Sequence, residues 1–222
     1  MPMITAGILG GIGSGKSTVT AMLVTRGATA IDADRLGHEA LREPEVKSAV
    51  RREFGDAVFD ADGWIVRASL ARMVFDDSPE GRRYLAALEA IVHPRISEAI
   101  ERRLADLRIA HVPLVILDAP VLLKARWDRF CDHLIFVDAP AEQRLARVRE
   151  RGWSEAEWRR REAAQEPLDR KRALCDTLID NGSGLERTRA QVDALVDRWL
   201  AADRTNLSPR CGKETDGGGN PR

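Results

Sequence analysis

A glycine-rich stretch near the N-terminus has the composition of a phosphate-binding loop. Gly10-Gly-Ile-Gly-Ser-Gly15-Lys16-Ser17 fits the pattern G-x-x-x-x-G-K-[ST], in which glycines let backbone N–H groups turn towards phosphate oxygens. The lysine of this pattern reaches the β- and γ-phosphates, and the serine hydroxyl is a ligand of Mg²⁺. An apolar segment precedes the stretch and a helical pattern follows it, as the motif requires. We expect ATP to be bound by Gly11, Ile12, Gly13, Ser14, Gly15, Lys16, Ser17 and Thr18.

Two aspartates, Asp32 and Asp34, end the segment 28–34 that we expect to form the second strand. Ligands of parallel sheets bind at the carboxyl ends of the strands, and residues two apart on a strand share a face. Both carboxylates are therefore expected to face the phosphate crevice. One would take the proton of an acceptor hydroxyl, with Asp34 the candidate, and the other would hold water or a metal. The alternative is that one or both cap a helix that begins near Leu36.

Asp118 closes the apolar run Val115-Ile-Leu117. This is the form of the acid that supports Mg²⁺ through water in P-loop proteins. An ordinary strand-end acid has the same form, so both interpretations stay open for this residue.

Arginines are concentrated between residues 141 and 174. Arg144, Arg147 and Arg151 recur at spacings that share a helical face, and further arginines follow among glutamates. Part of this segment is then a solvated surface with ion pairs. A mobile lid of the same composition would bring a guanidinium to the γ-phosphoryl group as it closes, and Arg147 is the first candidate for this catalytic role.

Short apolar segments alternate with helical patterns along the rest of the chain. Residues 112–118, 134–138 and 177–180 have the composition of strands buried in a parallel sheet. We predict an α/β fold, a P-loop NTPase core with a parallel sheet flanked by helices. Two mostly helical segments interrupt the alternation, and one of them contains a helix expected to begin near Pro94. Residues 203–222 are polar and glycine-rich, and we expect a disordered tail.

Composition narrows the function classes. The 222 residues contain 35 Lys and Arg and 35 Asp and Glu, so the net charge of zero does not favour nucleic acid as a partner. No apolar run is long enough for a membrane span, the three cysteines lack metal-ligand spacing, and no targeting segment precedes the loop. We expect a cytoplasmic monomer with no membrane partner. An Asn-Lys-x-Asp guanine motif is absent from the sequence, which disfavours a GTPase and leaves a small-molecule kinase.

Taken in order, the motifs resemble those of the dephospho-CoA kinase family over nearly the whole chain before the tail. The loop and Ile31-Asp32-Ala-Asp34 match two of its segments. The other matches are Gly63, Arg67, Leu70 and Phe75; Leu88-Glu89-x-Ile91-x-His93-Pro94-x-Ile96; Asp118-Ala-Pro120 with Leu122; Gln165; and Ile179-Asp180-Asn181-Gly182. The chain departs from the family at Leu9, often a threonine there, at Lys124, often a glutamate, and around Trp153 and Trp158.

The resemblance implies transfer of the ATP γ-phosphate to the ribose 3′-hydroxyl of dephospho-CoA, with Asp34 as the base. It implies a nucleotide core (1–35, 112–140 and 175–202), a helical CoA-binding insertion (36–111) and a helical lid (141–174). It places Asn181 and Gly182 on the adenine side, and on the acceptor side Arg67, His93, Pro120 and Leu122. For His93 the alternative is a histidine fixed by packing before Pro94. The rival functions are a kinase of another small acceptor, such as a nucleoside monophosphate, and a nucleotide-binding module without turnover.

Overall fold

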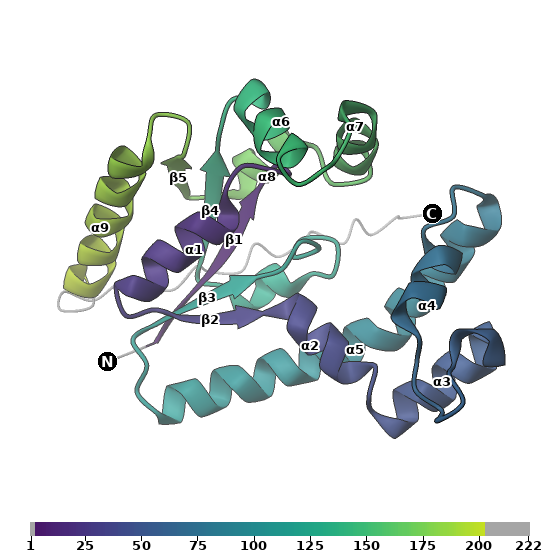
Figure 1. The fold of residues 1–222 in the computed structure, drawn as a ribbon. Helices are drawn as coiled ribbons and strands as arrows, with labels where there is room; N and C mark the ends of the chain where they lie inside the picture. Colours follow the sequence, from purple (N-terminus) through teal and green to yellow (C-terminus); the bar gives the residue numbers. More distant parts are fainter. Residues whose placement is uncertain (1–2, 203–222) are drawn as a thin grey trace, which may run out of the picture.

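A parallel sheet forms the centre of the molecule. The computed structural model describes residues 3–202, so the expected tail lies outside the described residues. The strand order is β2-β3-β1-β4-β5, with every pairing parallel (Figure 1). The strands are β1 (Ile4–Gly10), β2 (Thr29–Asp32), β3 (Leu114–Asp118), β4 (His133–Asp138) and β5 (Thr177–Asp180). The predicted α/β class with a parallel sheet is confirmed.

Helices connect the strands and form the two segments that interrupt their alternation. The α-helices are α1 (Lys16–Thr25), α2 (Ala33–Ala40), α3 (Pro44–Phe54), α4 (Arg67–Val74), α5 (Pro79–Ile109), α6 (Ala141–Arg149), α7 (Glu155–Ala163), α8 (Leu168–Leu174) and α9 (Leu185–Ala202). Two short 3₁₀ helices, η1 (Asp56–Val58) and η2 (Trp127–Phe130), lie in connections. None of the helices in the described part is long and apolar enough to cross a membrane.

The two faces of the sheet are covered by different helices. Because side chains alternate along a strand, Leu114 and Ile116 of β3 face one hydrophobic cluster while Val115 and Leu117 face another. The first cluster is completed by α1 and α9, and the second by α2, α5 and the loop after β3. Both faces are buried, which explains the continuous apolar runs of the strands.

The segment between β2 and β3 carries a hydrophobic cluster of its own. Six buried side chains from α3, η1 and α4 form it: Val46, Val50, Phe54, Val58, Leu70 and Val74. Residues from the first half of α5 pack against them, and the second half of α5 packs on the sheet. The long helix therefore ties this insertion to the core, and α3 and α4 lie to one side of the sheet in Figure 1.

The expected start of a helix near Pro94 is wrong. Helix α5 is continuous from Pro79 to Ile109 and contains Pro94 in its interior. A proline inside a helix removes one donor, the one that would reach the carbonyl four residues earlier. That residue is Ala90, which is solvent-exposed, so water can take the place of the missing donor.

Candidate active site

The glycine-rich loop lies between β1 and α1 and leaves the start of the helix open. Gly13 and Gly15 have φ angles of 82° and 91°, in the left-handed region that glycine tolerates. No side chain caps the first turn of α1, and no acidic residue lies in it. The first N–H groups of the helix are therefore available to an anion, which the helix dipole also favours.

Lys16 is partly buried and points back into this loop. Its ammonium donates to the carbonyl oxygens of Gly10 and Gly11, at 3.3 and 3.2 Å. Burial lowers the pKa of Lys16, the charges of Arg144 and Arg151 lower it further, and the charges of Asp118 and Glu162 oppose them. Because burial disfavours the charged form of this lysine, its ammonium gains by contact with phosphate oxygens.

Asn181 braces the loop from behind. The buried side chain donates from Nδ2 to the Ser14 carbonyl at 2.7 Å and accepts through Oδ1 from the Thr188 hydroxyl at 3.0 Å. A β-carbon added to Gly15 would lie only 2.0 Å from Asn181 Nδ2, so the close approach needs glycine as much as the φ angle does. The structure thus places Asn181 behind the loop, while the expected adenine-side role of Asn181 and Gly182 stays a prediction.

The predicted place of Asp34 on a strand is wrong. Strand β2 ends at Asp32, whose carboxylate accepts a hydrogen bond from the Arg35 N–H at 3.1 Å and caps α2. Asp34 therefore lies in the first turn of α2 and does not share a strand face with Asp32. Asp32 caps the helix four residues before its expected start near Leu36 and so ends the strand early, which is the alternative given above for this aspartate.

Three carboxylates nevertheless lie close enough at this edge of the sheet to influence one another. Partial burial raises the pKa of Asp34 and the charge of Asp32 raises it further, while His38 opposes them. Burial also raises the pKa of Asp118 at the end of β3, and there Asp32 and Asp34 act against the favourable charge of Lys16. Lys16, Asp118 and Asp34 thus form one electrostatically coupled set that joins the loop to the candidate base.

The residues present fit a Mg²⁺ ion that is bound by oxygen ligands from both the protein and the nucleotide. The Ser17 side chain is exposed at the start of α1, and Asp118 is the coupled carboxylate beside Lys16. Residues 3–202 contain no group of three His, Cys, Asp or Glu side chains placed to hold an ion by themselves. Mg²⁺ in kinases is usually held by one or two protein oxygens, phosphates and water. The mutual repulsion of the three aspartates is what a bound cation would relieve.

Helix α7 is fastened over the loop by two contacts. Arg144 of α6 forms an ion pair with Glu162 of α7 and is only 6% exposed. Both side chains lie over Gly11, where an added β-carbon would collide with the guanidinium. The indole N–H of buried Trp158 donates to the Ile12 carbonyl at 3.3 Å. These contacts place the arginine-rich segment directly on the phosphate-binding loop.

The expected role of Arg147 does not match its contacts. Its guanidinium donates to the carbonyl oxygens of Gly13, Ser14 and Asn181, at 3.2, 3.1 and 2.8 Å. Arg147 therefore supports the loop backbone and is not placed as a mobile group over the γ-phosphate. Arg151 lies beyond the end of α6, so the expected single helical face does not extend to it either. Its charge is nevertheless felt at Lys16.

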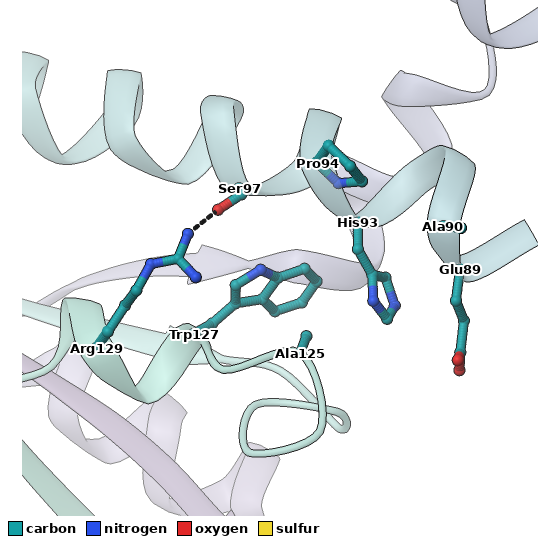
Figure 2. A pocket seen from close by; sticks show the side chains of 8 residues that line it. All are labelled: Glu89, Ala90, His93, Pro94, Ser97, Ala125, Trp127 and Arg129. Atoms are coloured by element: carbon teal, nitrogen blue, oxygen red, sulfur yellow. Dashed lines mark hydrogen bonds between the residues drawn. The ribbon is translucent and has the colours of Figure 1, made fainter. Parts of the chain in front are cut away.

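A cavity of about 330 Å³ lies between α5 and the loop after β3. It is lined by Glu89, Ala90, His93, Pro94, Ser97, Ala125, Trp127 and Arg129 (Figure 2). His93 contacts the Trp127 ring edge-on, with ring centroids 5.3 Å apart, and Arg129 donates to the Ser97 hydroxyl at 2.6 Å. Burial lowers the pKa of His93, which favours the neutral imidazole. Packing thus fixes His93, and the same packing presents it to the cavity.

The remaining acceptor-side candidates have different environments. Arg67 is exposed at the start of α4, and Pro120 is exposed in the loop after β3. Leu122 is 0% exposed, and its methyl group fills the space beside Gly7. The prediction that Leu122 contacts substrate is therefore wrong for this conformation, because the side chain belongs to the hydrophobic core.

Sequence reasoning missed the lid contacts of Arg144, Trp158 and Glu162 and the burial of Lys171. The repeated arginines pointed to the right segment, but the choice among them depends on contacts between residues far apart in the chain. Trp158 stood out as unfamiliar, and its indole is the group that reaches the loop.

The parallel sheet, the loop after its central strand and the helical segments on either side define a small P-loop kinase. The chain belongs to the dephospho-CoA kinase family, whose model matches residues 4–187. A dephospho-CoA kinase of Symbiobacterium thermophilum is 44% identical over 182 residues, which cover 81% of this chain and 74% of the relative. One from Frankia casuarinae is 38% identical over 187 residues, covering 83% and 78%.

Solved structures agree on the fold. The protein TT1252 of Thermus thermophilus superposes with a TM-score of 0.75 at 35% identity, covering 89% of this chain and 98% of that one. Dephospho-CoA kinase of Campylobacter jejuni gives a TM-score of 0.60 at 20% identity, covering 88% and 96%. The latter likeness concerns the fold alone.

Proposed function

We propose that this protein is an ATP-dependent dephospho-CoA kinase, which transfers the γ-phosphate of ATP to the ribose 3′-hydroxyl of dephospho-CoA. Family membership over most of the chain supports the reaction. The single structural observation that carries it is the coupled set of Lys16, Asp118 and Asp34 at one edge of the sheet. That set joins a phosphate-binding group to a carboxylate able to act as base.

The loop and Lys16 have the first task in this mechanism. Backbone N–H groups at the start of α1 bind the phosphates, and Lys16 exchanges its carbonyl contacts for β- and γ-phosphate oxygens. Ser17 and, through water, Asp118 would hold Mg²⁺, which would neutralise phosphate charge. Asn181 and Arg147 hold the loop in shape from behind.

Asp34 has the second task. A bond forms between the acceptor's 3′-oxygen and the γ-phosphorus, and the bond from that phosphorus to the β-γ bridging oxygen breaks. The bridging oxygen leaves with the electron pair as part of ADP, and Asp34 takes the hydroxyl proton late in the transfer. The raised pKa makes this carboxylate a stronger base than an aspartate of ordinary pKa.

We assign α7 to enclosing the phosphate-binding loop, and the insertion to binding the acceptor. Trp158 and Arg144 cover the loop and would exclude water from the transferring group. Arg160 of α7 pairs with Asp77 of the α4–α5 turn at 3.1 Å, so the lid and the insertion meet. We assign residues 36–111 to the acceptor, with Arg67, His93 and Pro120 on its side of the crevice.

The test is ADP release with ATP and Mg²⁺ and with dephospho-CoA, AMP, CMP or no acceptor. We expect turnover with dephospho-CoA alone. Turnover with a nucleoside monophosphate would keep the kinase core and discard the assignment of the insertion. No turnover with any acceptor, in a protein that binds ATP, would favour a nucleotide-binding module. The monomeric state and cytoplasmic location stay predictions.

A further inference from the structure

Helix α8 carries three consecutive cations, and only the buried one lacks a counter-ion. Arg170 and Arg172 are exposed and pair with Glu166 and Asp138, at 2.9 and 3.0 Å. Lys171 between them is 4% exposed, yet no carboxylate lies within ion-pair distance of it among residues 3–202. Its ammonium donates to Gln165 Oε1 at 2.7 Å, which uses one of its three donors. The two exposed arginines, which water already solvates, are thus the ones that have ion-pair partners.

This arrangement is costly in the absence of a ligand. Burial lowers the pKa of Lys171 from 10.5 to about 8, and the charge of Lys16 contributes in the same direction. Glu162 and Glu166 oppose the shift, and Arg144 adds to it. An apolar side chain of similar shape would pack at this position without this penalty. Packing therefore gives no reason for an ammonium at this position.

The position of Lys171 in the fold indicates a function for its ammonium group. Helix α8 contacts β1 and β4, the strands that lead into the phosphate-binding loop and into α6. The charge of Lys16 lowers the pKa of Lys171, and the same two neighbours act on both lysines: Arg144 lowers each pKa and Glu162 raises it. Lys16, Arg144 and Lys171 thus bring cations from α1, α6 and α8 to this region, where Glu162 is paired with Arg144 and neither lysine has an ion-pair partner among residues 3–202. Phosphate oxygens would supply the missing negative charge.

We propose that Lys171 is a phosphate-binding residue of the active site, whose ammonium contacts a phosphate of the bound substrates. This proposal rests on the proposed function for the presence of two phosphorylated substrates, ATP and dephospho-CoA. The terminal phosphate of ATP and the diphosphate of the acceptor present the same oxygen chemistry, so the experiment separates these sources. Gln165 holds the ammonium in place until the phosphate binds.

The first measurement is calorimetric binding of ATP, ADP and AMP, with Mg²⁺ and without acceptor, to the full-length Lys171→Met variant. If the contact is to the terminal phosphate, affinity for ATP falls about tenfold or more, while AMP affinity is unchanged. If the contact is to the acceptor, ATP affinity is unchanged and the Kd for dephospho-CoA, measured by calorimetry in the same way, rises by a similar factor. Because binding of ATP needs no turnover, failure of the proposed function would not be confused with failure of this proposal.

Two matched variants separate the effect of the Lys171 charge from effects on the structure of α8. Arg170→Met removes a cation from the same helix at an exposed, paired position, and all affinities should stay unchanged. Gln165→Leu removes the hydrogen bond and keeps the ammonium, so phosphate binding should largely persist. Should Lys171→Met fail to fold, Lys171→Gln gives a polar, neutral side chain for the same measurements.

Thermal unfolding distinguishes a phosphate-binding role of Lys171 from a structural one. Loss of a lysine that stabilises the fold would lower the unfolding temperature. A lysine whose pKa is lowered by folding opposes folding below about pH 8, and this opposition declines as pH rises from there towards 10.5. Lys171→Met without nucleotide should therefore unfold at an equal or higher temperature than the natural chain at pH 7. Weakened phosphate binding with equal or higher stability supports the proposal. Unchanged affinities for both substrates, or a large fall in the unfolding temperature without nucleotide, overturn it.

Discussion

The buried guanidinium of Arg144 and the half-buried carboxylate of Glu162 form an ion pair directly over Gly11 of the phosphate-binding loop. It joins α6 to α7 at the point where phosphates are expected to bind, and Trp158 adds a hydrogen bond to the same loop. Helices α6 and α7 therefore pack on the loop as one unit, and the position of α7 should depend on this pair.

Glu162→Gln should loosen α7 from the loop. Breaking a buried ion pair leaves an unpaired charge, which typically costs about 3–5 kcal/mol. We expect faster amide hydrogen exchange in residues 155–163, measured by mass spectrometry without nucleotide. The control is Glu157→Gln, which breaks an exposed pair with Arg161 on the same helix and should change little. Equal protection in both variants would show that the ion pair does not hold the lid.

Asp34→Asn should lower turnover with dephospho-CoA by about 10²–10⁴-fold, because the amide cannot accept the hydroxyl proton. ATP affinity, measured by calorimetry, should change little, since Asp34 has no part in the loop. Asp32→Asn is the matched control, because asparagine keeps the cap of α2. Equal losses of turnover and ATP affinity in Asp34→Asn, or an equal loss of turnover in both variants, would remove the general-base assignment.

The pH dependence of turnover offers a second test of Asp34. A base must be ionised, so kcat/KM should fall as pH falls through the pKa of Asp34, which burial and Asp32 raise above its ordinary value. Asp32→Asn removes one of the charges that raise this pKa. The acid limb of the profile should therefore move to lower pH in that variant. An acid limb that does not move would mean that another group controls it.

The spacing of residues in the sequence was enough to predict the phosphate-binding loop, because its glycines, Lys16 and Ser17 all lie within one short continuous segment. The apolar runs were enough for the parallel sheet, since burial on both faces leaves a direct mark on composition. Asp32 and Asp34 were harder, because the same residues suit a strand end and a helix cap. The structure decides this through one hydrogen bond to Arg35.

The contacts of the arginine-rich segment could not be predicted from the local sequence. Arg144 and Arg147 have the same residue type and nearly the same neighbours in sequence, yet one pairs with Glu162 and the other supports Gly13 and Ser14. Lys171 is one of three adjacent cations, and only packing of α8 on the sheet makes it the buried one. Such differences arise from tertiary contacts that spacing does not contain.

Lys16→Ala should weaken ATP binding by about 10–100-fold, because charge-assisted hydrogen bonds to phosphate oxygens contribute about 1.5–3 kcal/mol. AMP, which lacks the β- and γ-phosphates, should bind with similar affinity to both proteins. Lys47→Ala in α3 is the control, since that ammonium lies over the Trp64 ring. Unchanged ATP affinity in calorimetry would contradict the role of Lys16 in the loop.

Arg67→Ala tests whether the insertion binds the acceptor. Arg67 is exposed at the start of α4 and has no ion-pair partner in the described part of the chain, so its guanidinium is available to the diphosphate of dephospho-CoA. The KM for dephospho-CoA should rise about tenfold while ATP affinity stays unchanged. Arg72→Ala is the control, because Arg72 lies on the same helix and its guanidinium donates to the Ser69 hydroxyl. If both variants keep the natural KM, the acceptor contacts must be sought instead around the cavity formed by His93, Trp127 and Arg129, where His93→Ala would be the next variant.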